Sequence, residues 1–192
     1  MSLAPEEEAR ANFYALLSRL FYAPPDAALL RALATADELD SEDETLAARW
    51  RALIAAAAVM DPEAAREEYD AAFVGTGRAP ITLYTTAYSI KYSNEAPLAQ
   101  LRGELAALGL SRRESAGEPE DHIAALCDTM RHLIAGEHEL EMQKTFFERW
   151  IQPTAEPLCS AIEASEQLSF YKVVGRMAKT YFSLEQSGFE ML

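Results

Sequence analysis

Residues 117–135 read GEPEDHIAALCDTMRHLIA, and this stretch decides the fold class. Apolar side chains recur in it at the spacing of one helical face. They are Ile123, Leu126, Cys127, Met130, Leu133 and Ile134. Pro119 suits the first position of a helix, which would make Glu118 the cap. Glu120 and Asp121 would then face the positive end of the helix dipole. We therefore expect a capped amphipathic helix that begins at Pro119 and runs to the end of this stretch.

The same helical pattern extends outward over most of the chain. Further helices are expected over about residues 6–22, 27–33, 42–60, 62–74, 95–108, 137–151 and 168–186, with one more starting near 153–157. Asp26, Ser41 and Asp61 are the expected N-caps, and Ser93 or Asn94 would cap the helix at 95–108. The hexamer ITLYTT is the one β-like patch. The sequence thus predicts an all-α fold: a single-domain helical bundle of about eight to ten helices over residues 1–192, with a candidate hinge at 111–118.

Composition narrows the range of partners. The chain has 192 residues, a formal net charge of −14 and a pI near 4.6, so nucleic acid and anionic membranes would repel it. A basic peptide would be attracted. The longest apolar run, Leu53–Met60, is shorter than the ~18–20 residues of a membrane span. The acidic start MSLAPEEEAR is unlike a secretory signal. We expect a cytoplasmic protein without stable membrane insertion and without a nucleic-acid partner.

Metal and cofactor motifs are weak. Cys127 and Cys159 stand apart without a CxxC pattern and are expected to be core residues. The run HELEM at residues 138–142 resembles the zinc-protease motif HExxH, but methionine replaces the second histidine. We therefore expect no metal, no cofactor and no catalytic nucleophile.

Asp121 and His122 are the candidate chemical groups of the opening stretch. Adjacent side chains on a helix point about 100° apart, which is poor geometry for a hydrogen-bonded dyad but suits two contacts to one ligand. The helical pattern places Asp121, Asp128 and His132 on the solvent side and His122 at the margin of the apolar stripe. A capped structural helix and a binding or catalytic pair both remain open at this point.

The stretch GTGRAPITLYTTAYSIKY at residues 75–92 interrupts the helical pattern. It lacks the GK[ST] ending of a phosphate loop, and Gly75 is better explained as a helix C-cap. A long irregular loop in a compact domain usually has a function. Tyr84, Tyr88 and Tyr92 recur every four residues, so a short helix would place them on one face. They either pack the core or form the wall of a binding groove.

Taken together, these two stretches resemble the TorD/DmsD/NarJ family of cytoplasmic chaperones for molybdenum-containing redox enzymes. The first family signature appears as Phe73, Gly75, Pro80 and Tyr84–Tyr88, with Thr86 at a position that is serine in the family. The second appears as Pro119–Ile123. The segments FFERWIQPTAEPL and FYKVVGRMAKTYF resemble a third block. The resemblance covers roughly residues 10–186.

The resemblance implies a function. Such chaperones bind the twin-arginine signal peptide, or an N-terminal remnant, of an immature molybdoenzyme catalytic subunit and hold the subunit until its cofactor is inserted. A twin-arginine peptide has two cations followed by an apolar stretch, so it needs carboxylates beside an apolar groove. The expected peptide-binding residues are Phe73, Leu83, Tyr84, Tyr88, Glu118, Glu120, Asp121 and His122.

Two alternatives remain. One is a small-molecule enzyme that uses Asp121 and His122 as an acid/base pair, and the other is a plain helical adaptor without a peptide groove. The chaperone reading implies no catalytic residue. The protein is expected to be a monomer or a homodimer, in which the hinge at 111–118 would permit domain swapping.

Overall fold

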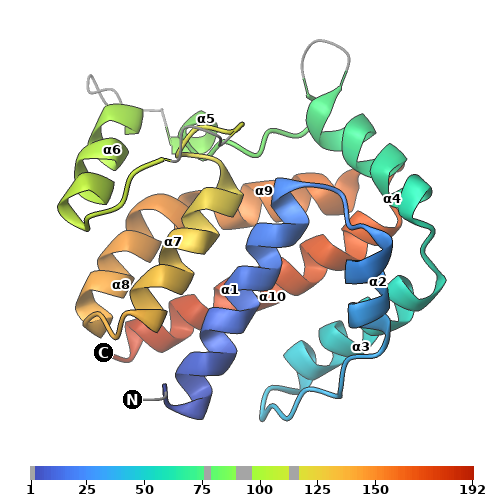
Figure 1. Cartoon of the computed structure of the whole chain (residues 1–192), viewed down its shortest axis with the longest axis horizontal. Coiled ribbons are helices and arrows are strands. Elements are labelled where there is room, and N and C mark those ends of the chain that lie inside the picture. Colours follow the sequence, from blue (N-terminus) through green and yellow to red (C-terminus); the bar gives the residue numbers. More distant parts are fainter. Residues whose placement is uncertain (1–2, 76–78, 90–96, 113–116) are drawn as a thin grey trace. The chain divides into compact units, whose positions relative to one another are not determined.

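The computed structural model describes residues 3–75, 79–89, 97–112 and 117–192. The all-α prediction is confirmed, because the regular elements within these ranges are all helices (Figure 1). They are α1 (Pro5–Tyr22), α2 (Ala27–Ala34), α3 (Glu44–Val59), α4 (Pro62–Tyr69), α5 (Thr86–Ser89), α6 (Pro97–Ala107), α7 (Ile123–Ala135), α8 (Leu140–Phe146), α9 (Gln152–Ala164) and α10 (Phe170–Glu190), with π-helical turns η1 (Asp70–Val74) and η2 (Phe147–Ile151).

The chain folds as two compact units, each built from two separate segments. Unit 1 comprises Met1–Tyr22 and Leu83–Thr154, and unit 2 comprises Ala23–Thr82 and Ala155–Leu192. Helix α9 begins in unit 1 and continues in unit 2. The hinge expected at 111–118 lies within unit 1, and residues 113–116 of it are outside the described ranges, so the hinge stays a prediction.

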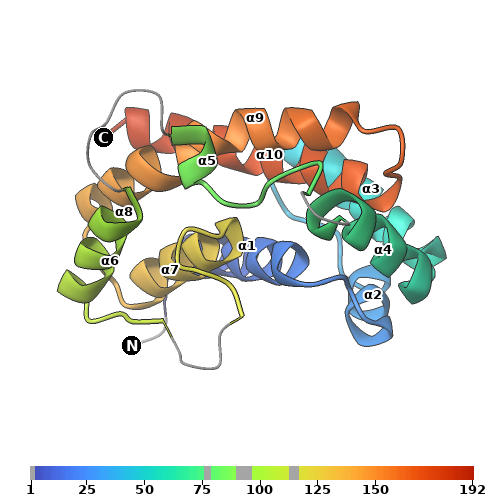
Figure 2. The same ribbon diagram turned by 90° about the horizontal axis from the view of Figure 1, so that it is seen from above.

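The core of unit 1 is the contact between α1 and α7. Figure 1 and Figure 2 both show these helices side by side. The stripe that the sequence predicted on α7 is buried, with Ile123, Leu126 and Met130 each 0% exposed. Tyr14 and Leu17 are buried to the same degree on α1. Helix α8 and turn η2 also pack on α7, so this helix is the central element of the unit.

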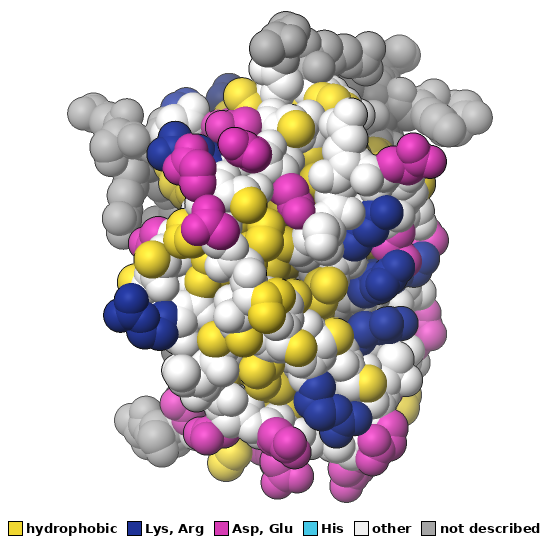
Figure 3. Space-filling model, turned by 90° about the vertical axis from the view of Figure 1, so that its right-hand side faces the viewer, with side chains coloured by type: hydrophobic (Ala, Val, Ile, Leu, Met, Phe, Trp, Pro, Cys, Tyr) yellow, Lys and Arg dark blue, Asp and Glu magenta, His cyan; other side chains and the backbone are white. Residues whose placement is uncertain are grey.

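The core of unit 2 is formed by α10 packed on α3 and α4, with α2 packed on α3. Gly175 lets α10 approach α9 closely, because a Cβ at this position would lie 2.7 Å from Cγ2 of Ile162. An aromatic cluster joins Tyr69, Phe73 and Tyr171, with ring centroids 5.1–5.7 Å apart. Figure 3 shows hydrophobic side chains gathered over the face on which α2, α3 and α4 lie, bordered by charged side chains.

Helices α2, α3 and α4 each begin with an aspartate cap. Asp26 and Asp61 cap α2 and α4 as expected, and Pro62 is the first residue of α4. The expected cap Ser41 is wrong. Asp43 caps α3 by accepting a hydrogen bond from the Leu46 N–H, while Ser41 Oγ accepts one from the Asp43 N–H. The proposed caps Ser93 and Asn94 lie outside the described residues.

The predicted start of α7 at Pro119 is also wrong. Helix α7 begins at Ile123, and its N-cap is His122, whose backbone is extended. Glu118 is therefore not a cap, and Asp121 precedes the helix instead of lying in its first turn. The reason is long-range pairing: the Ile123 N–H donates to the Leu83 carbonyl at 2.8 Å, which holds this residue against a distant segment.

The two cysteines lie in the core, as the sequence predicted. Cys127 and Cys159 are free and buried. Among the helices that the structure describes, none is both long and apolar enough to cross a membrane.

The N-terminus of α10 depends on a carboxylate from α4. Glu68 accepts hydrogen bonds from the backbone N–H groups of Ser169, Phe170 and Tyr171 at 3.0–3.2 Å. We expect Glu68→Gln to lower the free energy of unfolding by about 1–2 kcal/mol, because it weakens charge-assisted bonds to otherwise unsatisfied donors. Urea denaturation measures this change. The neighbouring exposed residue supplies the control, since Glu67→Gln removes the same charge; equal effects of the two variants would contradict the capping role.

Candidate functional site

The two stretches singled out by the sequence meet in unit 1. The Leu83 carbonyl accepts from Ile123, and the Thr85 N–H donates to the Asp121 carbonyl at 2.9 Å. Between these bonds, Tyr84 and His122 form an isolated antiparallel bridge. We call this pairing of residues 83–85 with residues 121–123 the bridge. It fixes the tyrosine-bearing segment against the start of α7.

Asp121 is the first residue of the second segment of the bridge, and it is only 4% exposed. Its carboxylate accepts a hydrogen bond from the Thr86 hydroxyl at 2.5 Å, at the first residue of α5. The expectation that Asp121 lies on the solvent side is therefore wrong. Asp128 and His132 do lie on the exposed side of α7, as expected. The buried carboxylate joins α5 to the turn that precedes α7.

His122 is 3% exposed and caps α7 with its ring. Nδ1 accepts from the Ala124 N–H at 3.2 Å, so in the neutral ring the proton sits on Nε2. Burial lowers the pKa of His122, against the opposing effect of the negative charges of Glu118 and Asp121. The ring also packs edge-on against Tyr84, with centroids 5.5 Å apart. A neutral ring matches its role as the cap acceptor.

The side chains of Asp121 and His122 do not form an acid/base dyad. Within the described residues, their hydrogen bonds go to Thr86 and to Ala124, not to each other. Among the residues that the structure describes, no group of three or more His, Cys, Asp or Glu side chains could hold a metal ion. The geometry is therefore that of a structural junction and not of a catalytic pair.

Glu118 is held at the surface by Tyr84. The Tyr84 hydroxyl donates to Oε2 of Glu118 at 2.6 Å, and Tyr84 is 37% exposed. This hydrogen bond, with some burial, raises the pKa of Tyr84 to about 12. The hydroxyl thus remains a neutral donor near pH 7.

Glu120 is paired with Arg102, a residue of α6. Nε and Nη2 of the guanidinium donate to Oε1 and Oε2 of the carboxylate, each at 3.0 Å. The hydrogen bond from Arg102 lowers the pKa of Glu120. The carboxylate side chain is only 13% exposed, whereas the arginine side chain is 52% exposed. This is a bidentate ion pair between two separate segments of unit 1.

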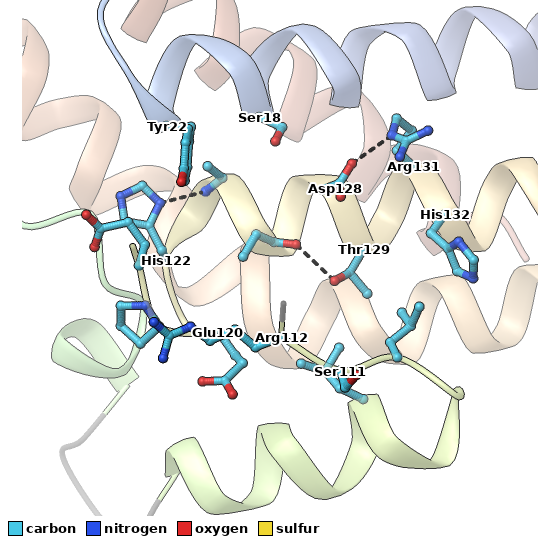
Figure 4. A pocket seen from close by; sticks show the side chains of 16 residues that line it. Ser18, Tyr22, Ser111, Arg112, Glu120, His122, Asp128, Thr129, Arg131 and His132 are labelled. Atoms are coloured by element: carbon cyan, nitrogen blue, oxygen red, sulfur yellow. Dashed lines mark hydrogen bonds and ion pairs between the residues drawn. The ribbon is translucent and has the colours of Figure 1, made fainter. Parts of the chain in front are cut away.

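Both glutamates line a cavity of about 710 Å³ within unit 1 (Figure 4). Its lining comes from α1, the end of α6, the segment before α7, and the exposed face of α7. The lining residues are Ser18, Tyr22, Leu105, Leu110, Ser111, Arg112, Glu118, Pro119, Glu120, His122, Ala124, Ala125, Asp128, Thr129, Arg131 and His132. Figure 4 shows Asp128 paired with Arg131 along one side, at 2.8 Å. The lining of the cavity thus includes both apolar side chains and the half-buried carboxylates of Glu118 and Glu120.

The other expected site residues are distributed differently. Leu83 is 3% exposed and belongs to the core. Tyr88 is half-buried on α5. Phe73 belongs to unit 2, where it packs against Tyr69 and Tyr171. Tyr92 lies outside the described residues.

Sequence reasoning missed Arg102, Thr86 as a hydrogen-bond donor, and the cavity residue Tyr22. Arg102 carries no local signal, because an arginine on an exposed helical face is common. Thr86 could have been found, since it occupies the serine position of the first family signature. Tyr22 ends α1 and is 50% exposed, which is unusual for a large aromatic side chain.

Comparison with known proteins identifies the family. The model of the nitrate reductase delta subunit family matches residues 36–160, which is more than half of the chain. A crystal structure from Archaeoglobus fulgidus, described as that of a candidate redox enzyme maturation protein, is similar with a TM-score of 0.60. The similarity covers 91% of this chain and 93% of the other at 18% identity, and it shows a shared fold. No curated protein matches the sequence.

The chain therefore belongs to the nitrate reductase delta subunit family, the TorD/NarJ-type family of redox enzyme maturation chaperones. The resemblance found in the sequence is confirmed. Members of this family are chaperones and not enzymes, so the acid/base enzyme is excluded by family membership. The family partner is a molybdoenzyme subunit.

The protonation of His122 gives a test of the bridge. The unfolded chain takes up a proton near pH 6.5, and the buried ring takes it up only at lower pH, so stability should fall as pH decreases below about 6.5. We expect His122→Asn, which keeps a capping acceptor without titrating, to show a smaller loss of Tm between pH 7.5 and pH 5.5. Thermal unfolding followed by circular dichroism measures this.

The matched control is His132→Asn, on the exposed face of α7. It should keep the pH dependence of the original protein. If both variants show the same pH dependence as the original protein, burial of His122 is not the source of the effect.

Proposed function

We propose that this chaperone binds the twin-arginine signal peptide, or an N-terminal remnant, of an immature molybdoenzyme catalytic subunit. Binding takes place in the cytoplasm and holds the subunit until its cofactor has been inserted. The peptide lies along the cavity of unit 1. The observation that carries the proposal is the pair of carboxylates, Glu118 and Glu120, on the lining of a cavity that also offers apolar surface.

Charge supports this proposal. Two arginines need two carboxylates at a spacing that a short peptide can reach, and Glu118 and Glu120 are separated by one residue. Glu118 accepts a hydrogen bond from a neutral hydroxyl and not from a cation, so an incoming guanidinium does not have to displace a positive charge there. The net charge of −14 adds a long-range attraction for a basic peptide.

The cavity also has apolar lining residues, which suit the apolar stretch that follows the two arginines of the peptide. The apolar residues Leu105, Leu110, Ala124 and Ala125 are part of the lining of the cavity. Tyr22 adds an exposed aromatic ring. An apolar segment that follows the arginines can bury its side chains against these groups.

The residues expected from the sequence fall into two roles in this proposal. Tyr84 and Tyr88 are partly exposed, and His122, although buried, is among the residues that line the cavity. Leu83 and Asp121 are buried beneath them and hold the bridge in place. The proposed contact of Phe73 with the peptide remains a prediction, since this residue belongs to unit 2.

Titration calorimetry with a synthetic twin-arginine peptide tests the proposal. We expect affinity to fall between about 0.05 M and about 0.5 M salt, because the Debye length shortens from roughly 14 Å to roughly 4 Å. Glu118→Gln should lower the affinity about tenfold, which corresponds to the loss of one charge-assisted contact of about 1.4 kcal/mol.

Glu63→Gln on α4 is the control, because it removes the same charge from an exposed position in unit 2. It should change the affinity by less than about twofold, as expected for an exposed charge that is not part of the cavity lining. If the peptide does not bind, or if it binds equally at both salt levels, the plain adaptor becomes the better account.

A further inference from the structure

The pairing of Glu120 has a consequence for the proposed peptide site. Of the two carboxylates proposed to bind the peptide, Glu120 is already paired with the guanidinium of Arg102 in the free protein. Arg102 donates through both Nε and Nη2, which is the fork geometry that an arginine of a bound peptide would use. Any cation that takes Glu120 must first replace Arg102.

We propose that Arg102 is an internal competitor of the peptide: it occupies Glu120 in the free protein as a substitute for a peptide arginine and so lowers the affinity for the peptide. The inference rests on the proposed function. A peptide guanidinium would donate two hydrogen bonds to Glu120 in place of the two that Arg102 donates in the free protein. The free-energy change of this exchange is therefore small. A lysine ammonium is a point charge without the planar fork, so it cannot restore the pair of parallel bonds.

Arg102 can leave Glu120 without releasing α6. Leu101 is 0% exposed and Leu105 is 7% exposed, so this helix is anchored by its apolar face. Two residues after Arg102, Glu104 accepts a hydrogen bond from Trp150 Nε1 at 2.5 Å and forms an ion pair with Arg149. These contacts do not involve Arg102, whose own side chain is 52% exposed and has room to move into solvent.

The two carboxylates are unequal in the free protein. Glu118 bonds the neutral Tyr84 hydroxyl, whereas Glu120 bonds a cation and also feels the positive charge of Arg112. The first peptide cation therefore has an open position at Glu118. The second gains Glu120 only by exchange, so the cost of displacing Arg102 falls on this second position.

The experiment compares two peptides, one with the arginine pair and one with both arginines replaced by lysine, on the original protein and on Arg102→Gln. Calorimetry should show that Arg102→Gln binds the arginine peptide about fivefold more tightly, since a competing, partly exposed ion pair is gone. The lysine peptide should gain no more than this, because displacing Arg102 costs the same free energy whichever cation takes Glu120, and an ammonium lacks the planar fork. The same substitution made together with Glu120→Gln should give no gain over Glu120→Gln alone.

Arg66→Gln is the matched control, because the Arg66 side chain is 58% exposed, close to the 52% of Arg102, and forms an ion pair with Glu63 in unit 2. It removes the same positive charge and should change the affinity for either peptide by less than about twofold. Arg102→Lys serves as a second variant, for which a smaller gain in the same direction is expected. Circular dichroism establishes that each variant is folded.

The possible outcomes separate the two proposals. Unchanged or weaker binding of both peptides by Arg102→Gln and by Arg102→Lys overturns the role of Arg102 and leaves the peptide site intact. A gain equal to that of Arg66→Gln overturns it as well, because net charge then explains the effect. If the original protein binds neither peptide, the proposed function fails, and this inference fails with it.

Discussion

The pairing of residues 83–85 with residues 121–123 is the interaction on which the site depends. It joins segments that are about forty residues apart in the sequence through two backbone hydrogen bonds. It also sets the first residue of α7, because Ile123 donates across the bridge and not to a preceding turn. The residues before Ile123 are therefore left outside the helix, where their side chains can serve other purposes.

Three acids in four residues consequently have three different environments. Asp121 is buried and bonded to Thr86, so it stabilises the junction. Glu118 lies beside a neutral tyrosine hydroxyl, and Glu120 lies beside a guanidinium. A continuous helix from Pro119 would have placed these acids in one exposed first turn, with similar charges and similar partners. The bridge is what makes them chemically distinct.

Local sequence patterns predicted the helices well. The apolar stripe of α7 is buried as its spacing indicates, and Asp26 and Asp61 cap the helices that they precede. The local pattern predicted the wrong start for α7, because residues near the start pair with a segment that is distant in the sequence. Pro119 has the residue type of a helix start, but the hydrogen bond from Ile123 to Leu83 overrides it.

The candidate site was predictable in part for the same reason. Both stretches were found from their composition and their family signatures, and the structure places them together. The burial of Asp121 and the ion pair of Glu120 with Arg102 depend on tertiary contacts, which periodicity does not report. Capping residues and binding residues also share the same chemistry, so an acid before a helix does not by itself reveal its role.

Amide hydrogen exchange with and without a twin-arginine peptide tests the central claim most directly, because it reports where the peptide binds. We predict slower exchange in residues 83–89 and 117–124 of the complex, with little change in α3 and α10. Slower exchange confined to α3 and α10, with residues 83–89 and 117–124 unaffected, would contradict the account.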